Sequence, residues 1–505
     1  MRKWLPLLTV CLGTFMLLID VTIVNVALPS MVTDLDASFG ALQWVIDAYA
    51  LALAALVLGA GSVADIIGHR RTYVAGLALF AVSSLLCGLA PDPGLLVAAR
   101  ALQGVGAAAM FATNFPLLNA SHTGRDRGIA YGLWGAVAGA SSAIGPIVGG
   151  VLTEYISWRW IFFVNLPVSA VAIGLALTKL ADARAQTRVR VDVPGIATFT
   201  AAAASATYAL IRANEDGWSD LGVWALLGAT IVLLAVFVLL ERRSDHPMFD
   251  LALLRNRSFV GVLIAGLLMT FAAFSAFTYT SIWLQSVLGM SPLEAGLTGL
   301  PLSITAFFVS ALLGRFLHEA RPDLVIGGGL AFIGVGGVVG ALLVHGSASW
   351  PALIPGFAIV GIGVGMVTPM LGSVSMSLVP LQRTGMAAGA LNTTRQLGFA
   401  FGIAAMGSVF VALSRHSLSG DGVPADSGIA HAIAGGQAAE VVRAAPVLDP
   451  AVHAAAVTGV QATFAMAGAI GLVATVAVLV LMRPTKPAAA TAGRPGQRPA
   501  VPASS

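Results

Sequence analysis

Four ionisable side chains lie inside stretches of this 505-residue sequence that are otherwise apolar. They are two acids, Asp20 and Asp47, and two bases, Arg100 and Arg395. An ionised side chain at the centre of a bilayer costs about 2.5–3.5 kcal/mol on insertion scales, so it needs a partner or a function. A carboxyl group kept from water can exchange a proton near neutral pH, whereas a guanidinium stays charged and needs an acid or a polar cavity. The pattern indicates proton transfer within a membrane.

Each of these residues also has a structural alternative. Asp20 could make an inter-helix hydrogen bond without any part in transport, and Asp47 lies nearer the end of its apolar stretch, where water reaches it. Arg100 is the natural counter-charge for a buried acid, but it could also bind backbone carbonyls. The sequence does not place Arg100 beside Asp20, and it supplies no partner for Arg395. We predict that Asp20 binds the proton and that Arg100 and Asp47 assist.

Small residues recur along the apolar stretch 128–152, where they would let a neighbouring helix approach closely. A proline among them removes one backbone hydrogen bond and permits a bend, so we predict a role in gating. Ordinary helix packing is the alternative. The positions are Gly135, Gly139, Gly145, Pro146, Gly149 and Gly150.

A short polar turn separates the second and third apolar stretches. It contains an acid followed by two bases, and such an order can form a charge latch that opens and closes. A plain turn at the membrane surface is the alternative. The candidate gating residues here are Gly61, Asp65, Gly68, Arg70 and Arg71.

All these residues belong to, or lie between, fourteen apolar runs. Each run has about 20 residues or more, which is enough to cross a hydrocarbon core about 30 Å thick. The runs are 5–29, 43–63, 72–91, 95–118, 128–152, 160–179, 194–213, 221–240, 259–284, 292–316, 324–345, 351–372, 385–413 and 458–482. We therefore predict an all-α polytopic membrane protein with fourteen transmembrane helices.

Positive charge lies mostly in alternate gaps between the runs. Of the 27 Lys and Arg residues, 21 fall on one side of the predicted membrane, four on the other and two within runs. Cytoplasmic loops are enriched in Lys and Arg, so the heavily charged side, with both termini, is predicted to be cytoplasmic. The segment 414–457 is then external, and the Pro-, Ala- and Arg-rich segment 483–505 is predicted to be a disordered cytoplasmic tail.

Composition restricts the possible functions. Charged residues make up 10% of the chain, whereas soluble proteins average about 25%. The net charge of +4 comes from loop residues that face an anionic leaflet, so no nucleic-acid partner is expected. None of the three lysines follows a glycine as in a phosphate-binding P-loop, and the eight histidines fall in loops or at run ends. We expect no cofactor and no metal, and the proton gradient as the energy source.

Several motifs resemble the major facilitator superfamily, specifically its fourteen-helix drug:proton antiporter family, and most closely actinomycete antibiotic self-resistance exporters. The resemblance spans about residues 1–482. The matching segments are 18–29 (helix-1 signature), 61–71 (gating loop, with Ile66 where arginine is usual), 100–106 (helix-4 proton-coupling motif), 135–150 (antiporter motif), 158–167 and 385–398.

The resemblance implies a division of the chain into a six-helix bundle over 1–180, linkers with an inserted helix pair over 181–257, and a second six-helix bundle over 258–482. A central cavity is expected between the bundles, with Asn25, Gln103, Asn392 and Arg395 as polar candidates for its wall. The implied activity is export of a small-molecule drug across the inner membrane in exchange for protons, by a monomer that alternates its access.

Two other function classes fit the sequence less well. An uptake symporter or facilitator of the same superfamily would lack the Gly-Pro pattern of 135–150 and usually the inserted pair. A membrane enzyme or channel is disfavoured because no nucleophile–base pair is visible and two helical halves suit alternating access. Multidrug relatives that carry divalent organic cations look to have an acid in the body of the helix that corresponds to 292–316. This run has none there, since Glu294 lies at its end, so the resemblance implies a cargo other than divalent organic cations.

Overall fold

The computed structural model describes residues 2–35, 39–181, 191–215, 217–315, 320–346, 348–424 and 428–482. At some helical positions, Asn25 and Pro146 among them, the side chain lies outside this description. The described residues form helices and connections, with no strand. The predicted tail 483–505 lies outside the described residues.

The helices of the first half precede the segment 182–190. They are η1 (Arg2–Trp4), α1 (Leu5–Asp34), α2 (Phe39–Ile67), α3 (His69–Gly88), α4 (Pro93–Ser121), α5 (Gly124–Tyr155), α6 (Trp160–Phe163) and α7 (Asn165–Lys179). An inserted pair follows, α8 (Val193–Glu215) and α9 (Leu221–Arg243).

The second half begins after the 3-10 helix η2 (Leu251–Arg255). Its helices are α10 (Arg257–Ser286), α11 (Pro292–Leu297), α12 (Leu300–Leu313), α13 (Pro322–Leu343), η3 (Trp350–Ala352), α14 (Leu353–Ser377), η4 (Leu381–Arg383), α15 (Thr384–Gly420), α16 (Ile429–Ala434), α17 (Ala438–Ala444), η5 (Pro446–Leu448) and α18 (Asp449–Leu481).

Thirteen of the described helical segments are long and apolar enough to cross a bilayer. Inside a hydrocarbon core every backbone N–H and C=O must find a partner within the protein, which is why apolar runs of this length become helices. The 32-residue α5 occupies the fifth predicted run but is not one of the thirteen. The all-helical membrane architecture is confirmed, and the count of fourteen spans remains a prediction.

Several boundaries differ from the predicted runs because hydropathy marks the apolar core and not the ends of a helix. α1 continues beyond 29 to Asp34, α15 extends to Gly420, and α18 begins at Asp449. The run 160–179 is divided between α6 and α7, and the run 292–316 between α11 and α12. The segment 414–457 contains α16 and α17, whose alanine-rich sequences favour helix.

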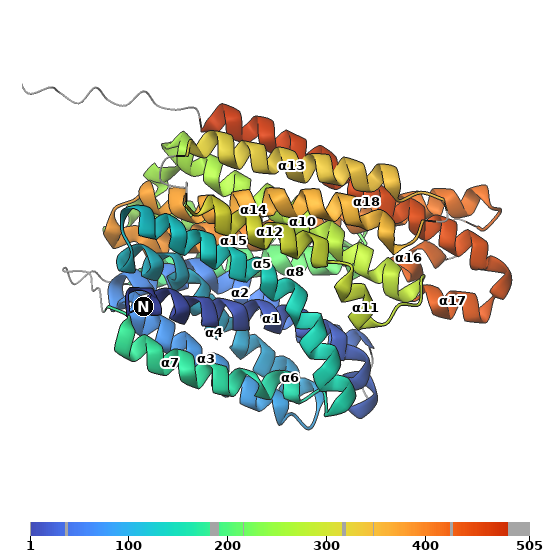
Figure 1. The fold of residues 1–505 in the computed structure, drawn as a ribbon, viewed down its shortest axis with the longest axis horizontal. Coiled ribbons are helices and arrows are strands. Elements are labelled where there is room, and N and C mark those ends of the chain that lie inside the picture. Colours follow the sequence, from blue (N-terminus) through green and yellow to red (C-terminus); the bar gives the residue numbers. More distant parts are fainter. Residues whose placement is uncertain are drawn as a thin grey trace, which may run out of the picture.

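The helices lie roughly parallel to one another and define two ends of the molecule (Figure 1). η1, which contains Lys3, and the last turn of α18 lie at one end, called the basic end below. α2 runs back from the far end of α1, so the turn between α2 and α3 lies at the basic end too. α16 and α17 lie at the opposite end, called the loop end (Figure 1). The arrangement places the described beginning and end of the chain on the same side of the bundle.

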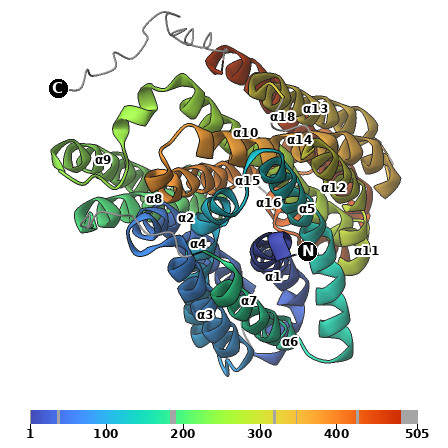
Figure 2. The same ribbon diagram turned by 60° about the vertical axis from the view of Figure 1, so that its left-hand side comes forward.

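The inserted pair lies at one side of the molecule. α8 packs against α9, α2 and α15, whereas α9 forms the outer edge, as Figure 2 shows. Only 17% of the α9 span is buried inside the protein, which suits a helix that faces lipid. The pair therefore contacts both halves through α8.

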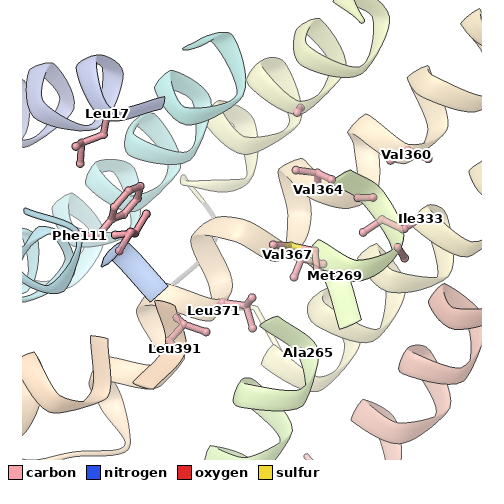
Figure 3. Packing of buried hydrophobic residues seen from close by; sticks show 14 of the residues in the cluster. Leu17, Phe111, Ala265, Met269, Ile333, Val360, Val364, Val367, Leu371 and Leu391 are labelled. Atoms are coloured by element: carbon pink, nitrogen blue, oxygen red, sulfur yellow. The ribbon is translucent and has the colours of Figure 1, made fainter. Parts of the chain in front are cut away.

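Apolar side chains from both halves form one continuous core. Figure 3 shows Leu17 of α1 and Phe111 of α4 facing the region of Leu371 of α14 and Leu391 of α15. The first half joins the second mainly through α2 with α15 and α5 with α12. These inter-half contacts frame the polar residues described next.

Candidate functional site

Asp20 lies in the middle of the first half and is fully buried. Its Oδ2 atom accepts a hydrogen bond of 2.5 Å from Nη1 of Arg100 on α4. Its Oδ1 atom accepts from Nε2 of Gln103 at 3.0 Å and from Nδ2 of Asn165 at 3.1 Å. The intramembrane acid and base that the sequence singled out are therefore direct partners, joined by two amides.

Arg100 is also buried, with 1% of its surface exposed. Its Nη1 atom donates to Oε1 of Gln103 at 2.6 Å, and its Nε atom donates to the backbone carbonyl of Val45 on α2 at 2.9 Å. The ring of Tyr49 lies 4.3 Å from the guanidinium carbon, a favourable cation–π distance. Arg100 thus serves both as counter-charge to Asp20 and as a pin to a backbone carbonyl, the two roles that the sequence left open.

A break in the helix brings Asn165 into the cluster. α6 ends at Phe163 and α7 begins at Asn165, so Asn165 is the first residue of the longer helix. Its Nδ2 atom also lies 3.3 Å from Oγ of Ser84 on α3, which accepts from Gln103 at 2.7 Å. Four helices, α1, α3, α4 and α7, therefore contribute to one polar cluster, which we call the Asp20 cluster: Asp20, Ser84, Arg100, Gln103 and Asn165.

Two members of the Asp20 cluster were not among the predicted site residues. Asn165 was noted only as part of the segment 158–167, although an amide inside an apolar run was a usable signal. Ser84 gave no signal, because serine is frequent in membrane helices, where its hydroxyl can bond to the backbone of its own helix.

Of the other predicted polar residues, Asn392 and Arg395 belong to α15 of the second half. Asp47 is half-buried on α2 and is not among the described partners of Asp20, which are Arg100, Gln103 and Asn165. Asn392 of α15 donates to the carbonyl of Phe111 on α4 at 3.2 Å, a bond between the halves. The Nε atom of Arg395 is buried and has no hydrogen-bond partner in the described part of the chain. The side chain of Asn25 lies outside the described part of the chain.

The predicted gating turn contacts the second half at the basic end. Oδ1 and Oδ2 of Asp65 accept from the backbone N–H groups of Gly385 and Met386, at 2.7 and 2.8 Å. These are unsatisfied donors at the start of α15, where a negative charge is also favoured by the helix dipole. Asp65 on α2 therefore caps a helix of the other half.

Glycines allow this close contact. A β-carbon on Gly61 would collide with the backbone oxygen of Gly385, and Gly68 has a φ of 110°, which favours glycine. Arg70 donates to the carbonyl of Leu180 at 3.2 Å, and Arg71 is exposed at the same turn. The predicted latch thus closes mainly on backbone groups of α15.

The small residues of α5 serve two different neighbours. Gly145 and Gly149 face α1, where added β-carbons would meet Thr22 and Ile23. Gly135 and Gly139 face α12, where they would meet Ser310 and Ala306. Gly150 has room, since the nearest atom to its added β-carbon would be 3.7 Å away on Leu293. α5 therefore packs tightly against its own half and against the second half at once.

The chain is 34% identical to the multidrug resistance protein Stp of Mycobacterium tuberculosis, over 81% of this chain and 76% of Stp. It is 36% identical to the puromycin resistance protein pur8 of Streptomyces alboniger, over 81% and 82% of the two chains. It is 33% identical to the tetracenomycin C resistance and export protein of Streptomyces glaucescens, over 96% and 93%.

Solved structures show the same fold at low sequence identity. The human organic anion transporter MFSD10 (TETRAN) matches with a TM-score of 0.64 at 15% identity, covering 94% of this chain and 99% of that one. The proton:xylose symporter XylE matches with a TM-score of 0.60 at 13% identity, covering 94% of each.

A sequence model of one family matches most of the chain, from residue 10 to residue 403. This match agrees with the resemblance found in the motifs and with the relatives named for drug resistance and export. The chain belongs to the Major Facilitator Superfamily.

Proposed function

We propose that the protein exports an antibiotic or a similar amphipathic drug in exchange for protons, by alternating access across the inner membrane. The observation that carries the proposal is the Asp20 cluster, a buried acid paired with an arginine inside a membrane-spanning bundle. The relatives support the cargo class, because Stp, pur8 and the tetracenomycin C protein are named for resistance or export.

The arrangement of the halves supports alternating access. At the basic end, Asp65 caps α15, and Oγ of Ser310 on α12 donates to the carbonyl of Gly132 on α5 at 2.9 Å. We assign the basic end to the cytoplasm, following the charge bias of the sequence. In this assignment the structure is a state closed to the cytoplasm, and opening requires the Asp65 cap and the α5–α12 contact to separate.

The proton cycle follows from the partners of Asp20. Paired with Arg100, the carboxyl group is satisfied as a carboxylate, because it accepts three hydrogen bonds and faces a fixed positive charge. A proton from outside neutralises Asp20 and weakens its attraction to Arg100. Rearrangement to the inward-facing state then releases the proton to the cytoplasm as the drug binds. Asp47 assists nearer the external mouth.

The position of Glu294 in the second half supports a cargo other than divalent organic cations. Glu294 completes a capping box with Ser291, in which the two residues bond reciprocally at 2.8 and 3.2 Å. This acid is therefore engaged at the start of α11. The energy source in this proposal is the proton gradient, with no cofactor, and the acting unit is a monomer.

A resistance panel in a pump-deficient host tests the proposal. The panel includes puromycin and tetracenomycin C, with and without a protonophore that collapses the gradient. We expect the protein to raise the inhibitory concentration of at least one compound, and we expect the protonophore to abolish this protection. Resistance that persists without the gradient contradicts proton antiport, and accumulation of the compound inside cells contradicts export.

A further inference from the structure

Two carboxyl groups that the transport cycle does not use meet at the basic end of the inserted helix pair. Asp192 precedes α8, and Glu241 lies in the last turn of α9. Oδ1 of Asp192 accepts from the backbone N–H of Gly195 at 2.9 Å, which is a helix N-cap bond. Both acids also bind the chain that leaves α9.

The connection from α9 to η2 is held by these two side chains. The N–H of Met248 donates to Oδ2 of Asp192 at 3.4 Å, and the N–H of Phe249 donates to Oε2 of Glu241 at 3.3 Å. Met248 and Phe249 are buried, at 2% and 7% exposure. The connection is therefore docked on a pair of acids and not on a basic side chain.

The second oxygen of Glu241 is an orphan. Only 4% of Glu241 is exposed, and its Oε1 atom has no hydrogen-bond partner among the described residues. A β-carbon built on Gly195 would lie 2.7 Å from this Oε1 and 2.8 Å from Oδ2 of Asp192. The two oxygens thus face the same small space beside Gly195, where a shared proton would satisfy both.

No described cation neutralises the pair. Arg242 and Arg243 follow on α9 itself but are exposed, as are Asp245 and His246 on the connection. From the neighbouring elements, Asp250 is paired with Arg383, and Asp65 of α2 is bonded to the start of α15. Glu241 is buried and Asp192 is half-buried. Two ionised carboxyl groups that face the same small space repel each other, so the doubly ionised pair is unfavourable.

We propose that Asp192 and Glu241 form a second proton-binding site, a carboxyl pair that holds one proton and senses the pH on the basic side of the membrane. With the proton bound, Glu241 donates to Asp192 and the connection stays docked. When the proton leaves, two negative charges face each other and the connection loosens. The docked state is therefore favoured at low pH and lost as the pH rises.

The carboxyl pair is linked to the gate by a short path. The docked connection leads directly to Asp250, whose side chain pairs with Arg383 and whose N–H lies 3.4 Å from Sδ of Met386. Met386 and Gly385 are the residues capped by Asp65. Release of the connection at higher pH is thus expected to loosen the α15 start and favour opening of the basic end.

Infrared difference spectroscopy on the purified full-length protein tests the site without measuring transport. Protonated carboxyl groups give a carbonyl band that disappears when they ionise. We expect one such band to be absent from the spectrum of Glu241→Gln. In Asp192→Asn the band should remain but disappear at a pH about one unit lower, because the repelling neighbour is gone. Asp92→Asn, which changes the N-cap of α4 in the same way, is expected to leave the band unchanged.

Amide hydrogen exchange of peptides covering 244–252 provides the second readout. Protection relative to the intrinsic exchange rate is expected to fall as the pH rises in the natural protein and to stay high in Glu241→Gln, which mimics the protonated form. A band that survives Glu241→Gln overturns the proposal, and so does a titration that Asp192→Asn leaves in place. A carbonyl band whose intensity at fixed pH changes when Na⁺ or K⁺ is added also overturns the proposal and assigns the space to a metal cation.

Discussion

Asp20 accepts three hydrogen bonds in this conformation, one on Oδ2 and two on Oδ1. A proton on Oδ2 would point at the N–H group of Arg100 from which this oxygen now accepts, and two donors cannot face each other. In the proposed cycle, proton uptake therefore accompanies a separation of the Asp20 and Arg100 side chains, and this exchange of partners would couple the proton to the conformation.

Asp20→Asn is expected to abolish proton-driven export. Asparagine keeps the shape and hydrogen-bonding capacity of the side chain but holds it in a neutral form. The variant should be inserted normally, yet drug uptake driven by a pH gradient in inverted vesicles should fall to the level of vesicles without the protein. Asp20→Glu should keep part of the activity.

Asp92→Asn is the matched control for this substitution, since Asp92 is an exposed cap of α4 that accepts from the N–H of Leu95. It should transport at the normal rate. Full uptake by Asp20→Asn would show that another group carries the proton, whereas loss of uptake in both variants would point to general damage.

The charged residues of the site could be predicted from the sequence, but their contacts could not. Asp20 and Arg100 could be picked out from the sequence because a charge inside an apolar run is expensive, and Gln103 followed from the motif resemblance. Their contact could not be derived, because the register between α1 and α4 depends on packing across the bundle. Asn165 enters through a helix break at Val164 that hydropathy does not reveal.

At the scale of the element, α5 has no room for a larger residue at Gly135, Gly145 and Gly149. Its Gly145 lies against Thr22 of α1, two residues after Asp20. A larger residue at position 145 would therefore push away the helix that carries Asp20. Overpacking of this kind costs about 1–3 kcal/mol. The apolar runs and their approximate spans were predictable for all such helices, but which face of α5 meets which partner was not.

Gly145→Ala is expected to reduce export by about tenfold while leaving insertion intact, because an overpacking cost of about 1.4 kcal/mol that falls on the gating movement slows it by a factor of ten. Gly150→Ala is the control on the same helix, since its new methyl group would meet only Leu293 at an ordinary distance. Thr22→Ala should restore part of the activity of Gly145→Ala. Normal export by Gly145→Ala would reduce the α5 pattern to ordinary packing.

Asp65→Asn is expected to favour opening of the basic end. Asparagine offers one acceptor oxygen where Asp65 uses two, and it removes a charge from the start of α15. The loss should be about 1–2 kcal/mol, roughly a tenfold rise in the open population. The measurement is the labelling rate of a cysteine at Thr384, which is 3% exposed, by a water-soluble maleimide after Cys11 and Cys87 have been replaced.

The matched control is Asp126→Asn at the same end of the molecule. Asp126 pairs with Lys3 at 3.0 Å in an exposed position, where an ion pair contributes little. Labelling of Thr384→Cys should be unchanged in this background. Equal rates in the Asp65 and Asp126 variants would remove Asp65 from the gate.

At the scale of the whole molecule, the predicted orientation in the membrane can be tested at the two ends of the bundle. η1 and the last turn of α18 share the basic end, and α16 and α17 lie at the loop end (Figure 1). A reporter that is active only in the cytoplasm should therefore work when fused after Met482 and fail when inserted at Gly435, between α16 and α17. A reporter active only outside should show the reverse, and any other outcome would overturn the predicted topology.

All the residues that bond to Asp20 precede residue 180, while α10 to α18 supply none of them among the described contacts. In the proposed mechanism, the chemistry that uses the proton gradient is confined to the first half, and the second half is free to vary. Selection for resistance to a new compound should accordingly enrich substitutions after residue 257 and spare the first half. Such a separation would let the range of exported compounds change by mutation without loss of proton coupling.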